Sequence, residues 1–241
     1  VPIMGRPLIA HVVDVLANHP RVATISISIE PEGFAPIAEA VWSLVCPARL
    51  RVVPAAETIA DSVTVAGRDL SGPILVTTAD NVMLRTRSID AIADALRDAD
   101  AAIAMAPRDA VLRAHPDGQR RFYRFCDGEY SNCNLYGLAG PEALSSAELF
   151  RGGGQFARKA GRMIAAFGIV NTLLMATGLL TLDAATRRLS SRLGLKLVPV
   201  RLEDGSQAID VDNERTYAVT EVLLRQIPAP AAARKVLREV A

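Results

Sequence analysis

The feature that most constrains the fold is the alternation of short β-branched segments with longer segments of helical periodicity. Residues 22–29 alternate β-branched and polar side chains, as a strand does. Residues 73–78 form a nearly continuous apolar run, which is typical of a strand buried on both faces. Helices that alternate with such strands predict an α/β fold: a three-layer αβα sandwich around a mostly parallel, Rossmann-like central sheet.

The same reading places the other elements along the chain. We expect helices over 7–19, 35–45, 57–69, 86–99 and 214–226, and further strands over 50–53, 101–106, 196–202 and 208–212. After Pro107, two strand-like stretches, 122–125 and 132–138, flank a turn at 126–129. We expect a helical insertion near 141–195, one domain over 1–227, and a linker with a short C-terminal helix over 228–241.

Composition excludes several classes of protein. The 241 residues are 50% hydrophobic and 22% charged, which is too apolar for a disordered chain and ample for a core. The net charge is +1 with both signs scattered, which argues against a nucleic-acid-binding protein. Three cysteines without CxxC spacing indicate a reducing, cytoplasmic compartment, with neither a disulfide framework nor a zinc site.

The first candidate functional group is Asp80, which directly follows the apolar run at 73–78. In open α/β sheets, ligands bind beyond the carboxyl ends of the strands. A carboxylate at that edge suits Mg²⁺, which needs one or two carboxylates besides the phosphates of a substrate. The alternative is that Asp80 only caps the next turn, where Asp is common.

A second candidate is the pair Asp210 and Asp212. If 208–212 is extended, alternation places both carboxylates on the same side, where a metal would relieve their repulsion. The alternative is a solvated strand edge at which Asp212 or Asn213 caps the final helix.

Together these motifs resemble the MobA-like NTP transferases, the molybdenum-cofactor guanylyltransferase type within the GT-A-like nucleotide-diphospho-sugar transferase superfamily. The resemblance covers roughly 3–140 and 195–225. The matching motifs are "GRPLI" at 5–9 (the family has "GKPLI"), "ADSV" at 60–63, "TTAD" at 77–80 and "IDVDNERTY" at 209–217.

This resemblance implies a Mg²⁺-dependent nucleotidyltransferase that joins an NTP, GTP or CTP, to a phosphorylated acceptor and releases pyrophosphate. The acceptor class, a sugar, polyol or lipid-linked phosphate, stays open. By the resemblance, Asp80 and Asp212 are the catalytic metal ligands and Asp210 a third candidate. The resemblance further implies that the nucleotide is bound by Arg6, Ser62 and Thr78 and the acceptor by Tyr130, Asn132 and Asn134.

For some of these residues a plainer role is open. Asn132 and Asn134 are two apart and suited to recognise hydroxyl groups, but they also suit the satisfaction of backbone groups. Arg6 can be a solvated surface residue. A GT-A glycosyltransferase that uses a nucleotide sugar shares fold and metal, although Asp80-Asn81-Val82 is not the D-x-D it would carry. A third hypothesis is a catalytically inactive nucleotide-binding or membrane-associated module.

In this family a first strand, a Gly-rich phosphate-binding loop and a catalytic lysine come before the motif at 5–9, and the 241 residues contain none of them. A sheet without its first central strand leaves its neighbours with open edges. We therefore expect about twenty to forty further residues before Val1 in the native chain, a strand and a loop. A native chain without that loop would favour the inactive module.

Residues 163–182 form an uncharged stretch of 20 residues between basic flanks. Its length would span a bilayer, but its glycines, Asn171 and threonines favour two or three shorter helices. Thr181 has the position of an N-cap for a helix over 182–193 that Gly194 ends. These helices either belong to the core or make peripheral contact with a membrane surface through their cationic flanks.

Overall fold

The computed structural model describes residues 1–144 and 178–227. The helices are α1 (Leu8–Ala17), α2 (Phe34–Val41), α3 (Ile59–Gly67), α4 (Thr86–Ala95), α5 (Arg108–Ala114), α8 (Leu182–Leu193) and α9 (Glu214–Gln226), with 3-10 turns η1 (Pro31–Gly33), η2 (Pro47–Arg49) and η5 (Gly205–Ala208). The strands are β1 (Pro2–Ile3), β2 (Arg6–Pro7), β3 (Ile25–Ile29), β4 (Leu50–Pro54), β5 (Ile74–Thr77), β6 (Ala101–Pro107), β7 (Tyr123–Phe125), β8 (Gly128–Leu138) and β9 (Leu197–Arg201).

Within the described residues, the main sheet has five strands in the order β5-β8-β6-β9, with β7 paired to β8. Strands β6 and β9 are parallel, whereas β8 runs antiparallel to both β5 and β6. The sheet is therefore mixed, because the β7–β8 hairpin inserts the long strand β8 between strands that share one direction. Strands β3 and β4 form a separate parallel pair. Among the described residues, no ladder joins this pair to the main sheet.

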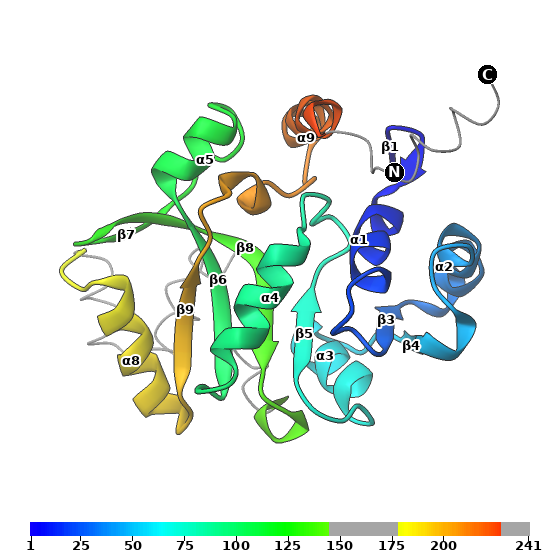
Figure 1. Ribbon diagram of the computed structural model, residues 1–241, viewed down its shortest axis with the longest axis horizontal. Helices are drawn as coiled ribbons and strands as arrows, with labels where there is room; N and C mark the ends of the chain where they lie inside the picture. The colour runs from blue at the N-terminus through cyan, green and yellow to red at the C-terminus, as the bar shows by residue number, and fades with distance from the viewer. Residues whose placement is uncertain (145–177, 228–241) are drawn as a thin grey trace.

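Helices cover both faces of the main sheet, as the alternation of β6 shows. Ala102, Ala104 and Ala106 pack with residues of α1, α4 and α9. The side chain of Ala101 points to the opposite face of the sheet. There it belongs to a cluster with Leu189 of α8 and Val63 of α3. These two apolar layers confirm the predicted three-layer sandwich, whose parallel strands end toward α5 and α9 (Figure 1).

The predicted starts of two helices are confirmed by their capping. The Thr181 hydroxyl accepts a hydrogen bond from the Ala184 N–H at 3.1 Å and begins α8. Gly194 ends this helix at φ 68°, the left-handed conformation that favours glycine. Asn213 begins α9 in a capping box with Thr216.

The expected strand over 208–212 is wrong. The chain forms the turn η5 up to Ala208, and the Asp212 N–H then donates to the Asp210 carbonyl at 3.1 Å, a tight turn that no extended strand makes. The run at 73–78 is also less buried than expected, since only Ile74 of β5 is fully buried. Helix α5, which follows Pro107 at its N-cap, was not anticipated from the sequence because it has only seven residues.

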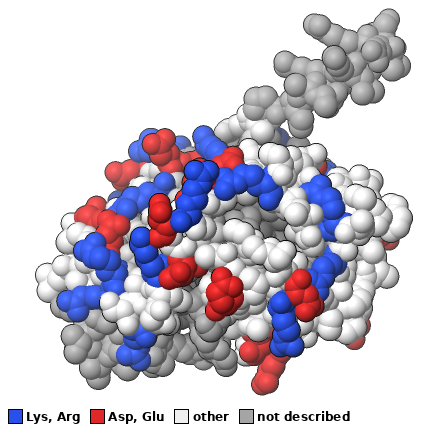
Figure 2. All heavy atoms as spheres, turned by 60° about the horizontal axis from the view of Figure 1, so that its bottom comes forward, with Lys and Arg blue, Asp and Glu red and all other residues white. Residues whose placement is uncertain are grey.

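The expectations for the insertion and the C-terminal segment concern residues that the structure largely does not describe. Most of the expected insertion, including 163–177 of the apolar stretch, and residues 228–241 lie outside the described residues. None of the helices in the described ranges is long and apolar enough to cross a membrane. Cys46, Cys126 and Cys133 are all free thiols. On the face shown in Figure 2, Lys and Arg are interspersed with Asp and Glu among the described residues.

Candidate functional site

Asp80 lies in the turn that follows β5, at the carboxyl edge of the sheet. The Asn81 N–H donates to the Thr78 carbonyl at 3.2 Å, and the Thr78 hydroxyl donates to the Asp80 carboxylate. The carbonyl of Asp80 accepts a hydrogen bond from the Val211 N–H at 3.3 Å. This last bond ties the end of β5 to the segment between η5 and α9, which carries the other two candidate carboxylates.

The carboxylates of Asp80, Asp210 and Asp212 lie close enough to affect one another. Burial raises the pKa of Asp210 well above its usual range, and the charges of Asp80 and Asp212 raise it further. The pKa of Asp212 is raised by burial and by the charge of Asp80. Oδ1 of Asp210 is buried and has no hydrogen-bond partner among the described residues. The three residues that the sequence proposed as metal ligands are thus brought together, although not by the strand from which their proximity was inferred.

The turn η5 holds Asp210 in this position. Asp204 caps the turn by accepting hydrogen bonds from the backbone N–H of Ser206 at 3.2 Å and from its hydroxyl at 2.6 Å. Gly205 packs so closely against α5 that a side chain there would overlap its backbone. Ala208 and Ile209 are fully buried in the main core. The chain therefore enters the site from an anchored turn.

Strand β8 adds a group of polar side chains beside these carboxylates. Opposite β6 the register shifts, and Asn134 adopts φ 46°, the left-handed conformation, in this bulge. The Asn132 amide donates to the Tyr136 hydroxyl, and its carbonyl oxygen accepts from the Asn134 N–H at 3.1 Å. Burial raises the pKa of Tyr136, and the nearby charge of Asp210 acts in the same direction.

Asn81 is a site residue that the sequence analysis did not identify. It is fully buried, and its amide donates to the Thr77 hydroxyl at 3.0 Å and to the Cys133 carbonyl at 3.1 Å. Asn81 thereby fixes the turn that carries Asp80 against β8, although its own Oδ1 has no hydrogen-bond partner in the described part of the chain. The only signal in the sequence was its place next to Asp80, since a buried polar partner on β8 cannot be read from local pattern.

Other predicted site residues are engaged elsewhere. The Ser62 hydroxyl bonds to the backbone of Ala56, with the Ala56 N–H donating at 2.9 Å. Arg6 forms an ion pair with Asp14 at 3.3 Å and donates to the Ala10 carbonyl. Neither residue contacts the three carboxylates among the interactions of the described chain, and their roles toward a nucleotide stay predictions.

Tyr130 is buried among apolar and aromatic side chains. Its ring meets Phe125 edge-on with centroids 5.9 Å apart, and it packs with Met105 and Leu182. The guanidinium of Arg201 lies 5.6 Å from its centroid. The structure therefore places Tyr130 in the contact between β8 and α8, and its role toward an acceptor stays a prediction.

The residues present suit a divalent cation completed by a substrate. Within residues 1–144 and 178–227, no three His, Cys, Asp or Glu side chains are already arranged to hold a metal ion. Asp80 and Asp212 offer two carboxylates at the open edge of the sheet, and the unpartnered Oδ1 of Asp210 lies behind them. Two carboxylates with phosphate oxygens make up the usual environment of Mg²⁺.

Solved structures with the same architecture are transferases. A hypothetical transferase from Thermus thermophilus superposes with a TM-score of 0.66 at 21% identity, over 90% of this chain and 88% of that one. The 4-diphosphocytidyl-2C-methyl-D-erythritol synthase of Anaerococcus prevotii gives 0.60 at 11% identity, over 93% and 88%. The chain has the fold of these transferases.

A third structure extends the comparison. A CMP:2-keto-3-deoxy-manno-octonic acid synthetase complexed with CTP gives a TM-score of 0.57 at 14% identity, over 94% of this chain and 90% of that one. No protein-family model and no curated protein sequence matches the chain.

Proposed function

We propose that this protein is a Mg²⁺-dependent nucleotidyltransferase that joins an NTP to a phosphorylated acceptor and releases pyrophosphate. The observation that carries the proposal is the convergence of Asp80, Asp210 and Asp212 at the carboxyl edge of the sheet. In open α/β folds, ligands bind at this edge. The charge of Asp80 raises the pKa of both Asp210 and Asp212, and such a group of carboxylates is poorly arranged for a purely structural turn. Asp80 and Asp212 would instead suit a cation whose remaining ligands are phosphate oxygens of the substrate.

In the proposed reaction, an oxygen of the acceptor phosphate attacks the α-phosphorus of the NTP in line. A new P–O bond forms as the bond to the pyrophosphate leaving group breaks. Asp80 and Asp212 would hold Mg²⁺, which would neutralise the charge that develops on the phosphate oxygens. The acceptor phosphate is already an anion, so no side chain has to remove a proton from it.

The fold comparison supports this class of reaction and points to the first NTP to try. Two proteins of the same fold are named as a 4-diphosphocytidyl-2C-methyl-D-erythritol synthase and a CMP:2-keto-3-deoxy-manno-octonic acid synthetase, the latter complexed with CTP. We therefore infer that CTP is the first nucleotide to test, with GTP as the second because of the resemblance of the motifs at 5–9 and 77–80.

The test is pyrophosphate release by the full-length native protein, supplied with each of four NTPs, Mg²⁺ and a panel of sugar and polyol phosphates. Acceptor-dependent release with one NTP is the expected result. Asp80→Ala should lower turnover by at least about a hundredfold, because it removes a group that stabilises the transition state. The fold should persist, since the Asp80 carbonyl that accepts from Val211 remains.

The matched control is Asp98→Ala, because Asp98 is exposed and forms no ion pair in the described part of the chain. This variant should release pyrophosphate at the wild-type rate. Wild-type turnover in Asp80→Ala would refute the role of Asp80. Release of a nucleoside diphosphate from a nucleotide sugar, without pyrophosphate from any NTP, would establish a glycosyltransferase instead.

A further inference from the structure

Arg85 is a partly buried cation that follows the turn of Asp80 along the chain. Its backbone begins α4, where the Arg85 carbonyl accepts from the N–H groups of Ser88 at 3.1 Å and Ile89 at 3.4 Å. Its guanidinium is partly buried, yet it makes no hydrogen bond or ion pair within residues 1–144 and 178–227. Five donors in a partly desolvated position without an acceptor are costly unless a ligand satisfies them.

The charge balance around Arg85 leaves one positive charge in excess. Arg87 pairs with Asp204 at 2.6 Å, and Asp204 also accepts both hydrogen bonds from Ser206. Arg85 feels the charges of Asp204 and Arg87 through space only, and its pKa is lowered mainly by burial. Asp204 is thus the carboxylate that acts on both guanidinium groups, but its oxygens are already engaged by Arg87 and Ser206.

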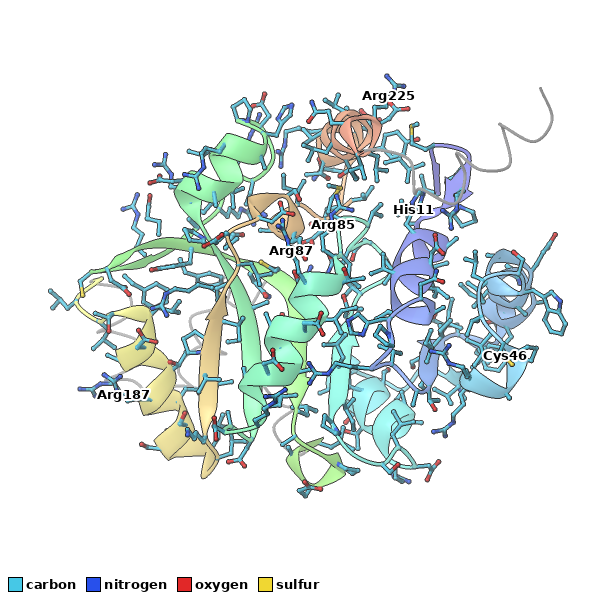
Figure 3. All side chains as sticks on the ribbon, in the orientation of Figure 1. His11, Cys46, Arg85, Arg87, Arg187 and Arg225 are labelled. Carbon is cyan, nitrogen blue, oxygen red and sulfur yellow. The ribbon has the colours of Figure 1, made fainter. Side chains whose placement is uncertain are left out.

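The position of this pair links it to the three carboxylates. Two consecutive turns, closed by the Asn81 N–H to Thr78 and the Leu84 N–H to Asn81, lead from Asp80 to Arg85. On the other side, Asp204 caps η5, the turn that leads to Asp210. Figure 3 shows Arg85 and Arg87 next to each other between the first turn of α4 and η5.

We propose that Arg85, assisted by Arg87, binds a phosphate group of a substrate at the carboxyl edge of the sheet. This inference deepens the proposed function and rests on it for the identity of the substrate. The planar fork of a guanidinium matches two oxygens of a phosphate, which gives both affinity and orientation. The first turn of α4 holds no acidic residue that would repel such a group.

The chemistry of the transfer also calls for a cation at this place. An anionic acceptor phosphate must approach the phosphates of an NTP, so two like charges meet beside three aspartates. A guanidinium at the same edge of the sheet would offset that repulsion and stabilise the charge of the transition state. The acceptor phosphate and the triphosphate of the NTP share this chemistry, and kinetic measurements distinguish them.

The binding experiment needs no turnover. Inorganic phosphate and pyrophosphate are titrated calorimetrically into the full-length protein and into three variants, Arg85→Gln, Arg85→Lys and Arg187→Gln. Arg187 is an exposed arginine on α8, far from Arg85 in Figure 3. Arg85→Gln should weaken binding about ten- to hundredfold, the loss of a charge-assisted hydrogen bond pair. Arg85→Lys should weaken it less, and Arg187→Gln should not change it.

The kinetic measurement assigns the phosphate group. A rise in KM for the acceptor alone in Arg85→Gln places the acceptor phosphate on Arg85, and a rise for the NTP alone places the triphosphate there. Wild-type phosphate binding in Arg85→Gln, or no phosphate binding by the wild-type protein, overturns the proposal. If Arg85→Gln loses phosphate binding while no NTP is turned over, the phosphate site stands and the proposed function fails. Unchanged melting of Arg85→Gln confirms that it is folded.

Discussion

At the scale of single residues, Gly205 shows how packing alone determines where a candidate ligand lies. An added Cβ at this position would overlap the backbone carbon of Ala110 and the backbone nitrogen of Val111. Because these atoms belong to the backbone of α5, no rotamer change can relieve the overlap. We expect Gly205→Ala to lower the free energy of unfolding by about 1–3 kcal/mol and to reduce activity, since η5 leads directly to Asp210. Denaturant unfolding and the pyrophosphate assay measure the two effects.

Gly72→Ala is the control for that prediction. Gly72 has φ 75°, and an added Cβ there meets nothing within 4 Å. Its cost is therefore conformational, about 1 kcal/mol, and it should leave activity unchanged. Equal stability of Gly205→Ala and the wild-type protein would show that η5 is not fixed by this close approach.

Asn134 allows backbone and side chain to be separated at one position. Its φ of 46° is accessible to Asn and Gly but strained for Ala. We expect Asn134→Ala to cost about 1 kcal/mol more stability than Asn134→Gly, because only Gly keeps the left-handed bulge without strain. Thermal or denaturant melts of the pair test this. If both variants melt alike, the bulge contributes nothing through its backbone conformation.

Among the site residues, the sequence was informative wherever chemistry follows from position along a strand. Asp80 was identified because it follows an apolar strand. Asp210 and Asp212 were identified from an expected strand over 208–212 that does not form, so their proximity was predicted for the wrong reason. Asn81 was missed, because it acts through a partner on another segment, the Cys133 carbonyl. Such contacts depend on the strand order of the sheet, which local pattern does not contain.

At the scale of elements, η5 depends on a charge that titrates. Burial by itself would raise the pKa of Asp204, but hydrogen bonds from Ser206 and Arg87 outweigh it and leave the pKa below its ordinary value. A lowered folded pKa means that the stabilisation is present above the unfolded pKa of about 3.9 and is lost as the pH falls through the folded value. We expect Asp204→Asn to lose about 0.2–1 kcal/mol at neutral pH, because Arg87 is largely exposed.

The measurement for this prediction is unfolding free energy from pH 7 down to pH 2. The gap between the wild-type protein and Asp204→Asn should close as the pH falls, since asparagine still caps η5 but carries no charge to lose. Asp98→Asn, at an exposed position, should run parallel to the wild-type curve. A gap that stays constant to pH 2 would assign the loss to hydrogen-bond geometry and not to the charge of Asp204.

At the scale of the whole molecule, helices were easier to predict than the connections of the strands. Helix α9 was expected over its observed range, because Asn213 marks its start and the helical periodicity of the following residues marks its extent. The place of β8 was not foreseeable, because a hairpin that inserts antiparallel between β5 and β6 has the same local pattern as one that adds to an edge. The separate pairing of β3 with β4 is likewise a property of the assembled sheet.

That separate pairing leads to a prediction about how the molecule opens. Strands β4 and β9 both have five residues and, in the described ranges, one pairing neighbour. Strand β9 belongs to the five-stranded sheet and β4 to a sheet of two. Two-stranded sheets are marginal by themselves, and every residue of β4 is at least partly exposed. We expect amide hydrogens of β4 to exchange faster than those of β9, because β3 and β4 can open while the main sheet stays closed. Hydrogen exchange resolved by residue measures this, with the central strand β6 as the slow reference, and equal protection of β4 and β9 would mean that the two sheets unfold as one unit.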